Sequence, residues 1–120
     1  MGLVPLEELL AERDELVRQV APLRALHGPG GTWDDMRRME RSRLAQRIRA
    51  IAVRDEKKLT EAAIDDAALS DLDYAAFVAA GTREKAAYYE LEARIQGIEF
   101  TINRGQAIAR YLAAEVHLGG

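Results

Sequence analysis

The sequence predicts an all-α protein, an antiparallel helical hairpin or bundle with a long C-terminal helix. Three observations lead to this prediction. Apolar residues recur at spacings of three and four along most of the chain, and no segment shows the alternation of a strand. The composition, 48% hydrophobic and 31% charged, is typical of long helices when that spacing is present. A chain of 120 residues has about the length of one small domain, so we expect a single helical domain over 1–120.

The composition also excludes several classes of protein. There is no cysteine, so disulfides, thiolate metal ligands and cysteine nucleophiles are excluded together, in keeping with a reducing compartment. No stretch approaches the roughly 18 uninterrupted apolar residues that a membrane-spanning helix needs. Residues 1–10 lack the basic and then apolar layout of a signal peptide. We therefore expect a cytoplasmic protein with no membrane partner.

The first helix is predicted over 5–26. Pro5 suits a first helical turn, and leucines and valines then recur with helical spacing. Pro22 lies inside this segment, where it removes one backbone hydrogen bond and can bend the last turn. The glycine-rich run 27–31 should stop the helix and turn the chain.

Two helices are predicted after the glycine-rich run. Thr32, with Asp35 three residues later, predicts a capping box that opens a helix continuing to about Lys58. Thr60 predicts the N-cap of a short helix that ends near Leu69.

The rest of the chain is expected to hold one short connecting helix and one long helix. Ser70 with Asp73 predicts a capping box at the start of the connecting helix. Gly81 and Thr82 predict its end and the cap of the next helix. No proline follows, so we expect one uninterrupted helix over about 83–116.

Two apolar stripes run along the predicted long helix. The first alternates spacings of three and four, as a coiled-coil seam does, and comprises Tyr88, Leu91, Ile95, Ile98, Ile102, Gly105, Ala109, Leu112 and Val116. The second is less regular and comprises Tyr89, Ala93, Gly97, Phe100, Arg104, Ala107 or Ile108, and Tyr111. One helix thus needs two partners, so we expect a homo-oligomer. The expected interface residues are Tyr88, Ile95, Ile102, Arg104, Gly105, Ile108 and Tyr111.

The charge is unevenly distributed along the chain. Segments 1–36 and 59–120 carry net charges of −4 and −5, whereas 37–58 carries +6. Seven of the nine basic residues in 37–58 are arginines, whose planar guanidinium groups bind phosphate with two hydrogen bonds. The candidate nucleic-acid-binding residues are Arg37, Arg38, Arg41, Arg47 and Arg49. The alternative is that these arginines pair with the acidic residues of the first helix.

No motif predicts catalysis, a metal site or a cofactor. The run 27–31 resembles a phosphate-binding loop, but Asp34 and Asp35 neutralise the helix end that follows, and the Lys-Ser/Thr pair is missing. His27 and His117 have no neighbour at ligand spacing and are interpreted as isolated surface histidines. The paired aspartates occur mostly where helices begin, and no serine lies in a nucleophile elbow. We expect a protein that is not an enzyme.

Three side chains of the second stripe suggest a further role. Phe100, Arg104 and Tyr111 share one side of the long helix, where aromatic rings could stack on unpaired bases while the guanidinium binds phosphate. Core or interface packing is the more common role of such aromatics.

Two segments resemble the UvsY-like family of phage recombination mediators. One is the run 101–110, Thr-Ile-Asn-Arg-Gly-Gln-Ala-Ile-Ala-Arg, reached through 88–91; the other is 35–40, Asp-Met-Arg-Arg-Met-Glu, followed by Arg47-Ile48-Arg49. The resemblance implies a ring-like helical oligomer that binds single-stranded DNA. It also implies help in loading a recombinase onto DNA covered by a single-strand-binding protein, in the host cytoplasm if the protein is phage-encoded. Carried over by residue, it places oligomer contacts on Ile102, Arg104, Gly105 and Ile108, and DNA contacts on Arg47 and Arg49.

The first functional hypothesis is therefore a non-enzymatic accessory protein of DNA recombination that binds single strands. The alternative is a structural or adaptor protein, such as a virion assembly component or a regulator that docks a helix in the groove of a partner protein.

Overall fold

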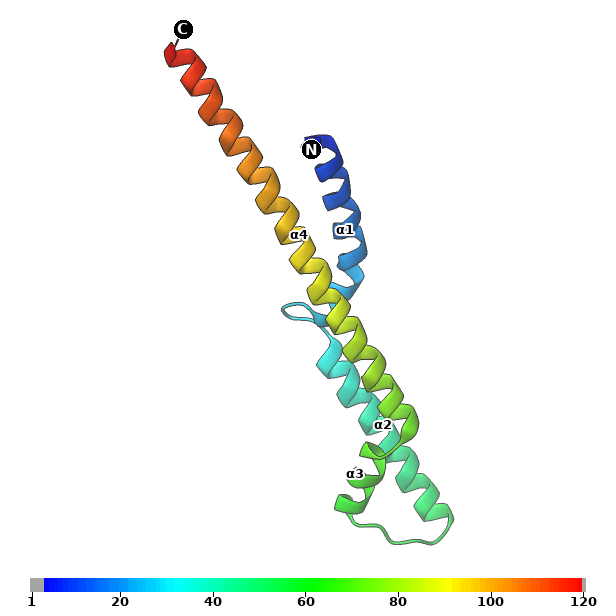
Figure 1. Cartoon of the computed structure of the whole chain (residues 1–120). Coiled ribbons are helices and arrows are strands. Elements are labelled where there is room, and N and C mark those ends of the chain that lie inside the picture. The colour runs from blue at the N-terminus through cyan, green and yellow to red at the C-terminus, as the bar shows by residue number, and fades with distance from the viewer. Residues whose placement is uncertain (1–3, 120) are drawn as a thin grey trace. The chain divides into compact units, whose positions relative to one another are not determined.

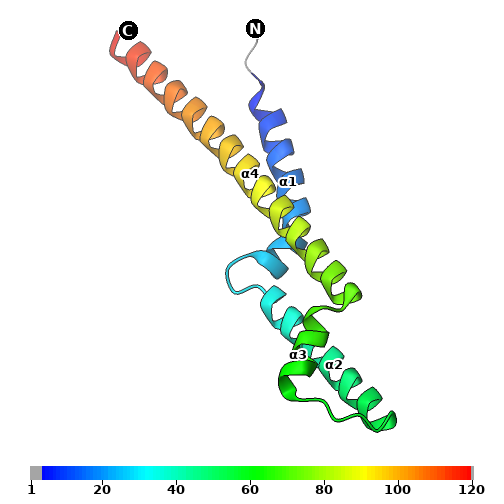
Figure 2. The ribbon, with the colours of Figure 1, turned by 60° about the horizontal axis from the view of Figure 1, so that its bottom comes forward.

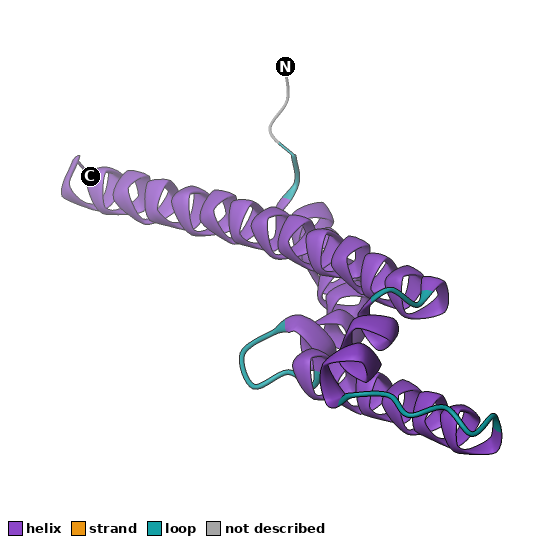
Figure 3. Cartoon of the chain, turned by 90° about the horizontal axis from the view of Figure 1, so that it is seen from below, coloured by secondary structure: helices purple, strands orange, loops and turns teal. Residues whose placement is uncertain are grey.

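A computed structural model describes residues 4–119 of the chain, and the side chains of 4–116. It holds four helices, α1 (Leu6–His27), α2 (Trp33–Arg54), α3 (Glu61–Leu69) and α4 (Leu72–Gly119) (Figure 1). No strand occurs in this part of the chain, in which short loops join the helices (Figure 3). The all-α prediction is confirmed.

The chain divides into two compact units. Unit 1 comprises residues 1–22 and 87–120, and unit 2 comprises 23–86. Helices α1 and α4 each contribute to both units, because the boundaries fall at Pro22 and after Ala86. The single-domain prediction stays a prediction.

Unit 1 is a pair of helices, the part of α1 up to Pro22 and the part of α4 after Ala86, which run in opposite directions (Figures 1 and 2). Its buried apolar residues lie on facing sides of the two helices: Leu16 and Val20 of α1, and Tyr88, Ile95 and Ile102 of α4. The three α4 residues are seven apart, with half-buried Leu91 and Ile98 between them, which is the spacing of a coiled-coil seam. The predicted antiparallel hairpin with a long C-terminal helix is therefore confirmed.

Unit 2 is built around Trp33, the first residue of α2. Its indole ring is 8% exposed and lies 5.1 Å from the ring of Phe77 and 5.4 Å from that of His27, measured between ring centroids. On the other side of the unit α2 packs against α3, burying Ala52 and Ile64 among others. Aromatic pairs at these separations add to the free energy of burial.

Gly81 does not end a helix, as the sequence suggested, and α4 runs without interruption from Leu72 to Gly119. A Cβ atom at Gly81 would lie 2.0 Å from two ring carbons of Trp33, so the glycine lets the helix approach the indole. The Thr82 hydroxyl donates to the carbonyl of Val78, four residues back, instead of capping a new helix.

The N-caps differ in part from those predicted. Thr60 caps α3 as expected, because its hydroxyl accepts a hydrogen bond from the Ala63 N–H at 3.1 Å. At α4 the cap is Asp71, whose carboxylate accepts from the Tyr74 N–H at 2.9 Å, so the predicted role of Ser70 is wrong. Thr32 makes no side-chain cap, and its hydroxyl instead lies 3.9 Å from the sulfur of Met36.

Helix α2 ends at Arg54, four residues before the predicted end. The Lys57 N–H donates to the Ala52 carbonyl and the Glu56 N–H donates to the Val53 carbonyl, the two bonds of a Schellman motif. Glu56 occupies the left-handed position of this motif, with φ +57°. Since glycine usually fills that position, the sequence carried no ordinary stop signal here.

The first helix was predicted well. It begins and ends one residue from the expected bounds, and it continues through Pro22. In the turn that follows, Gly30 has φ +71° and a Cβ on Gly31 would lie 2.3 Å from the Leu26 carbonyl oxygen. Both glycines are therefore required by the backbone of the turn.

Candidate nucleic-acid interface

Three arginines of α2 form one stripe on its exposed surface. At 100° per residue, Arg43, Arg47 and Arg54 fall within an arc of about 40°. Their side chains are exposed, and the arc avoids the buried face of Leu44 and Ala52. No acidic residue occurs between Glu40 and Asp55 in the sequence, so the middle of α2 carries only positive charge. We call these three residues the arginine stripe.

The five arginines predicted from the sequence do not share a face. Arg47 belongs to the arginine stripe, whereas Arg38 and Arg49 project from the opposite flank of α2. Arg37 and Arg41 lie near the packed side, and Arg41 is half-buried. The five residues therefore cannot contact one strand together.

Most ion pairs of these arginines are local. Arg37 lies 3.7 Å from Asp34 and Arg38 lies 3.7 Å from Asp35, each pair spanning three residues of exposed helix. Such pairs contribute only about 0–1 kcal/mol to stability, and phosphate can replace the carboxylate. The expected pairing with the first helix is not found among the pairs of the described residues, where Glu12 lies 3.8 Å from Arg94 of α4.

The arginine stripe is paired at its ends and open at its centre. Arg43 donates to both carboxylate oxygens of Glu40, at 2.8 and 2.9 Å, and Arg54 donates to Asp55 at 3.3 Å. Within residues 4–116 no ion pair is found for Arg47. The central guanidinium is thus available to a ligand without the loss of a protein contact.

Arg49 has a structural partner. Its guanidinium donates to the Glu61 carboxylate at 2.6 Å, which links α2 to the first turn of α3. This hydrogen bond and the charge of Glu61 raise the pKa of Arg49 above its usual value. A nucleic acid would have to compete with this bond, so Arg49 is a poorer phosphate ligand than the sequence suggested.

Arg43 and Arg54 were not among the nucleic-acid-binding residues predicted from the sequence. The signal was present, since residues spaced by 4 and then 7 lie on one side of a helix. It was hidden because nine basic residues in 22 fill almost every direction around the helix axis. Only the buried face of α2 shows which of them share a surface.

The second stripe of α4 is open to solvent. Tyr89, Phe100 and Tyr111 are 57%, 67% and 68% exposed, and Arg104 is exposed beside them. The side chains suggested for base stacking and phosphate binding, Phe100, Arg104 and Tyr111, are therefore accessible to solvent within one chain.

The expected oligomer contacts fall into two groups. Tyr88, Ile95 and Ile102 are at most 6% exposed within one chain, so they are not available to a second copy, contrary to the prediction. The reason is that α1 covers the seam as far as Ile102. The others, Arg104, Gly105, Ile108 and Tyr111, are exposed.

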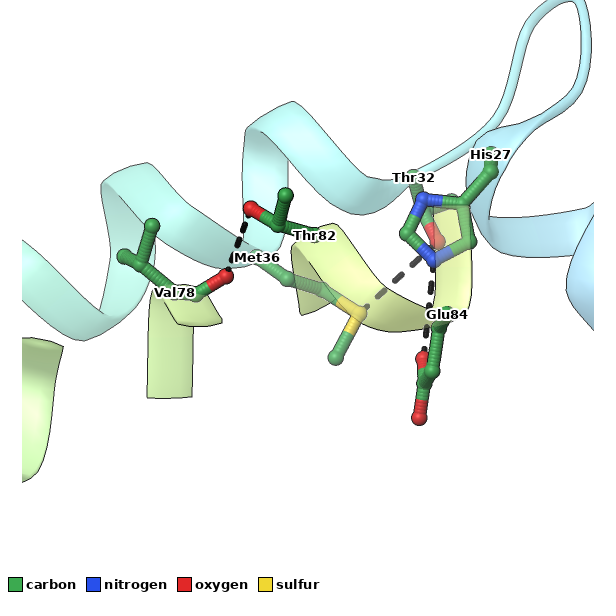
Figure 4. A network of polar contacts seen from close by, with 6 residues as sticks. All are labelled: His27, Thr32, Met36, Val78, Thr82 and Glu84. Atoms are coloured by element: carbon green, nitrogen blue, oxygen red, sulfur yellow. Dashed lines mark hydrogen bonds and ion pairs between the residues drawn. The ribbon is translucent and has the colours of Figure 1, made fainter. Parts of the chain in front are cut away.

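His27 is not a surface histidine. Its side chain is fully buried, with Nε2 3.5 Å from the Glu84 carboxylate (Figure 4) and Nδ1 without a hydrogen-bond partner in the described structure. The adjoining cavity holds about 70 Å³ and has one acidic and one basic side chain in its wall, Asp34 and Lys85, so its charge favours neither an anion nor a cation. His117 lies outside the residues whose side chains are described.

Over the described residues no three His, Asp or Glu side chains are placed to hold a metal ion. In the same part of the chain no helix is sufficiently long and apolar to span a membrane. No family model, curated protein or solved structure matches the chain.

Proposed function

We propose that the protein is a non-enzymatic accessory protein that binds single-stranded nucleic acid through the arginine stripe of α2. The observation that carries the proposal is the alignment of Arg43, Arg47 and Arg54 on one exposed arc, with Arg47 unpaired among the described residues. Guanidinium groups in a row neutralise successive phosphates and release counterions, which is the main source of sequence-independent affinity.

The exposed aromatic residues of α4 favour a single strand over a duplex. The exposed rings of Phe100 and Tyr111 can stack only on bases that are unpaired. The resemblance to phage recombination mediators agrees with this substrate. The role that follows is to help load a recombinase onto single-stranded DNA covered by a single-strand-binding protein.

The test is fluorescence anisotropy of a labelled oligothymidylate, titrated with the full-length protein at several salt concentrations. We expect affinity that falls steeply as salt rises. In the triple variant Arg43→Ala/Arg47→Ala/Arg54→Ala, the slope of log K against log salt should decrease by about 2, since each phosphate contact contributes about 0.7 for single strands.

A matched control removes the same charge elsewhere on α2. The variant Arg37→Ala/Arg38→Ala/Arg49→Ala should keep most of the salt slope, after circular dichroism has shown that both variants are helical. Equal weakening in the two triples would mean that only the net charge matters and would overturn the arginine stripe. Absence of salt-dependent binding in the unmodified protein would reject the function.

The second candidate is an adaptor that docks on a partner protein. The observation favouring it is the exposure of Tyr89, Phe100 and Tyr111, because aromatic residues are enriched at protein interfaces. The anisotropy titration separates the two candidates, since an adaptor of this kind needs no affinity for the oligonucleotide.

A further inference from the structure

The coiled-coil seam of α4 is longer than the helix that covers it. Glu12 of α1 lies beside Arg94 of α4, and in an antiparallel pair each step back along α1 is a step forward along α4. Leu6, the first residue of α1, therefore lies near residue 100 of α4. Figures 1 and 2 show α4 continuing past the first turn of α1.

Beyond Ile102 the seam keeps its spacing but loses its cover. Ile102 is 5% exposed, whereas Leu112 and Val116 are 53% and 75% exposed. Gly105 also faces open space, because a Cβ built there meets nothing within 4 Å. The four seam residues Gly105, Ala109, Leu112 and Val116 thus form an uncovered continuation of an interface that is closed within the chain. We call them the free seam.

We infer that the free seam pairs with the free seam of a second copy of this chain in antiparallel orientation. In that orientation Gly105 faces Val116 of the second copy, and Ala109 faces Leu112. Every layer then joins a small residue to a large one, which fills the space between two helices at ordinary packing density. In the parallel orientation the layers would be Gly105 on Gly105 and Ala109 on Ala109, which leaves two hollow layers.

The flanks and the length of the free seam agree with this partner. Of the four positions beside the seam, Gln106, Ile108 and Ala113 carry no charge and Glu115 is acidic. In the antiparallel register Glu115 lies near the uncharged Ile108 of the second copy, so like charges do not meet there. In the antiparallel pair, residue 119 of the second copy would reach residue 102, close to where α1 begins on the same seam. The second copy therefore fits into the length of α4 that α1 leaves open. This inference is independent of nucleic-acid binding.

The first test is sedimentation of the full-length protein from about 5 to 500 μM, because a short overlap predicts an association that depends on concentration. Leu112→Glu should raise the dimer dissociation constant at least tenfold. The control Tyr111→Glu changes a neighbour that is also exposed, at 68% against 53% for Leu112, but lies outside the seam. It should change the dissociation constant less than twofold. A protein that stays monomeric throughout the range, or equal weakening in both variants, would overturn the inference.

The second test determines the orientation, using the absence of native cysteines. Gly105→Cys and Val116→Cys are made as separate proteins with different fluorescent tags and equilibrated in a glutathione redox buffer. Antiparallel pairing predicts a mixed disulfide between the two proteins and little homodimer, since residues 105 of the two copies would lie about 16 Å apart along the axis.

The control for this test is Gly97→Cys, a glycine that also faces open space but lies on the second stripe. It should form no more disulfide with Val116→Cys than random collision gives. Homodisulfides of Gly105→Cys in place of the mixed species would show a parallel pair and contradict the antiparallel layers.

Discussion

Gly81 lies against the indole ring of Trp33, and this contact leaves no room for a methyl group. We therefore expect Gly81→Ala to destabilise the protein by about 1–3 kcal/mol, because the ring must move from its place beside Phe77. Urea denaturation followed by circular dichroism measures the change.

Gly97 provides the matched control, since it is in the same helix and a Cβ there meets nothing. Gly97→Ala should stabilise the helix by up to about 1 kcal/mol through helix propensity alone. If both substitutions had the same sign, the close contact between Gly81 and Trp33 would not be the reason for the glycine.

Among the residues that the structure describes, Glu56 is the non-glycine residue with a positive φ, and it lies in the turn that ends α2. Glu56→Gly should stabilise the protein by about 0.5–1 kcal/mol, because the left-handed conformation is costly for a residue with a Cβ. Denaturant titration measures this change, and Glu56→Ala serves as a control for the loss of the carboxylate. A Gly variant no more stable than the Ala variant would contradict the geometry of the turn.

The roles of Gly81 and Glu56 could not be predicted from the sequence, because each depends on structure that the residue type alone does not indicate. A glycine in a helical pattern can be a stop or a site of close approach, and only the partner ring distinguishes the two. A glutamate in the left-handed position gives no signal at all. By contrast Thr60 was predicted correctly, because its cap depends only on a neighbour three residues away.

At the scale of helices, the start of α4 depends on Asp71. Its carboxylate accepts a hydrogen bond from the Tyr74 N–H, so Asp71→Ala should lower the free energy of unfolding by about 0.5–2 kcal/mol. Thermal or urea unfolding measures the loss.

Ser70→Ala tests the same helix end without removing that bond. We expect a change below about 0.5 kcal/mol, since Ser70 makes no cap of α4. A larger loss in Ser70→Ala than in Asp71→Ala would restore the cap predicted from the sequence.

The seam of α4 was the element that the sequence predicted most completely. Its heptad spacing identified the residues that α1 buries, because periodicity is a local property of the chain. The point where α1 ceases to cover the seam was not predictable. It depends on the register between two helices that are more than 60 residues apart in sequence.

For the chain as a whole, the overall charge of −3 conceals a basic helix. The sequence identified α2 as the basic element, but it could not show which arginines face outward together. The packing of α2 against α3 determines which arginines face outward, and it places Arg49 in an ion pair with Glu61. The arginine stripe is thus a property of the folded unit 2.

At the scale of the whole molecule, the main feature is that the coiled-coil seam of α4 is longer than the part of it that α1 covers. Amide hydrogen exchange of the full-length protein at about 5 and 500 μM tests this most directly. We expect the amides of 105–116 to exchange more slowly at the higher concentration and those of 88–102 to exchange at an unchanged rate. Identical exchange of 105–116 at both concentrations would contradict it.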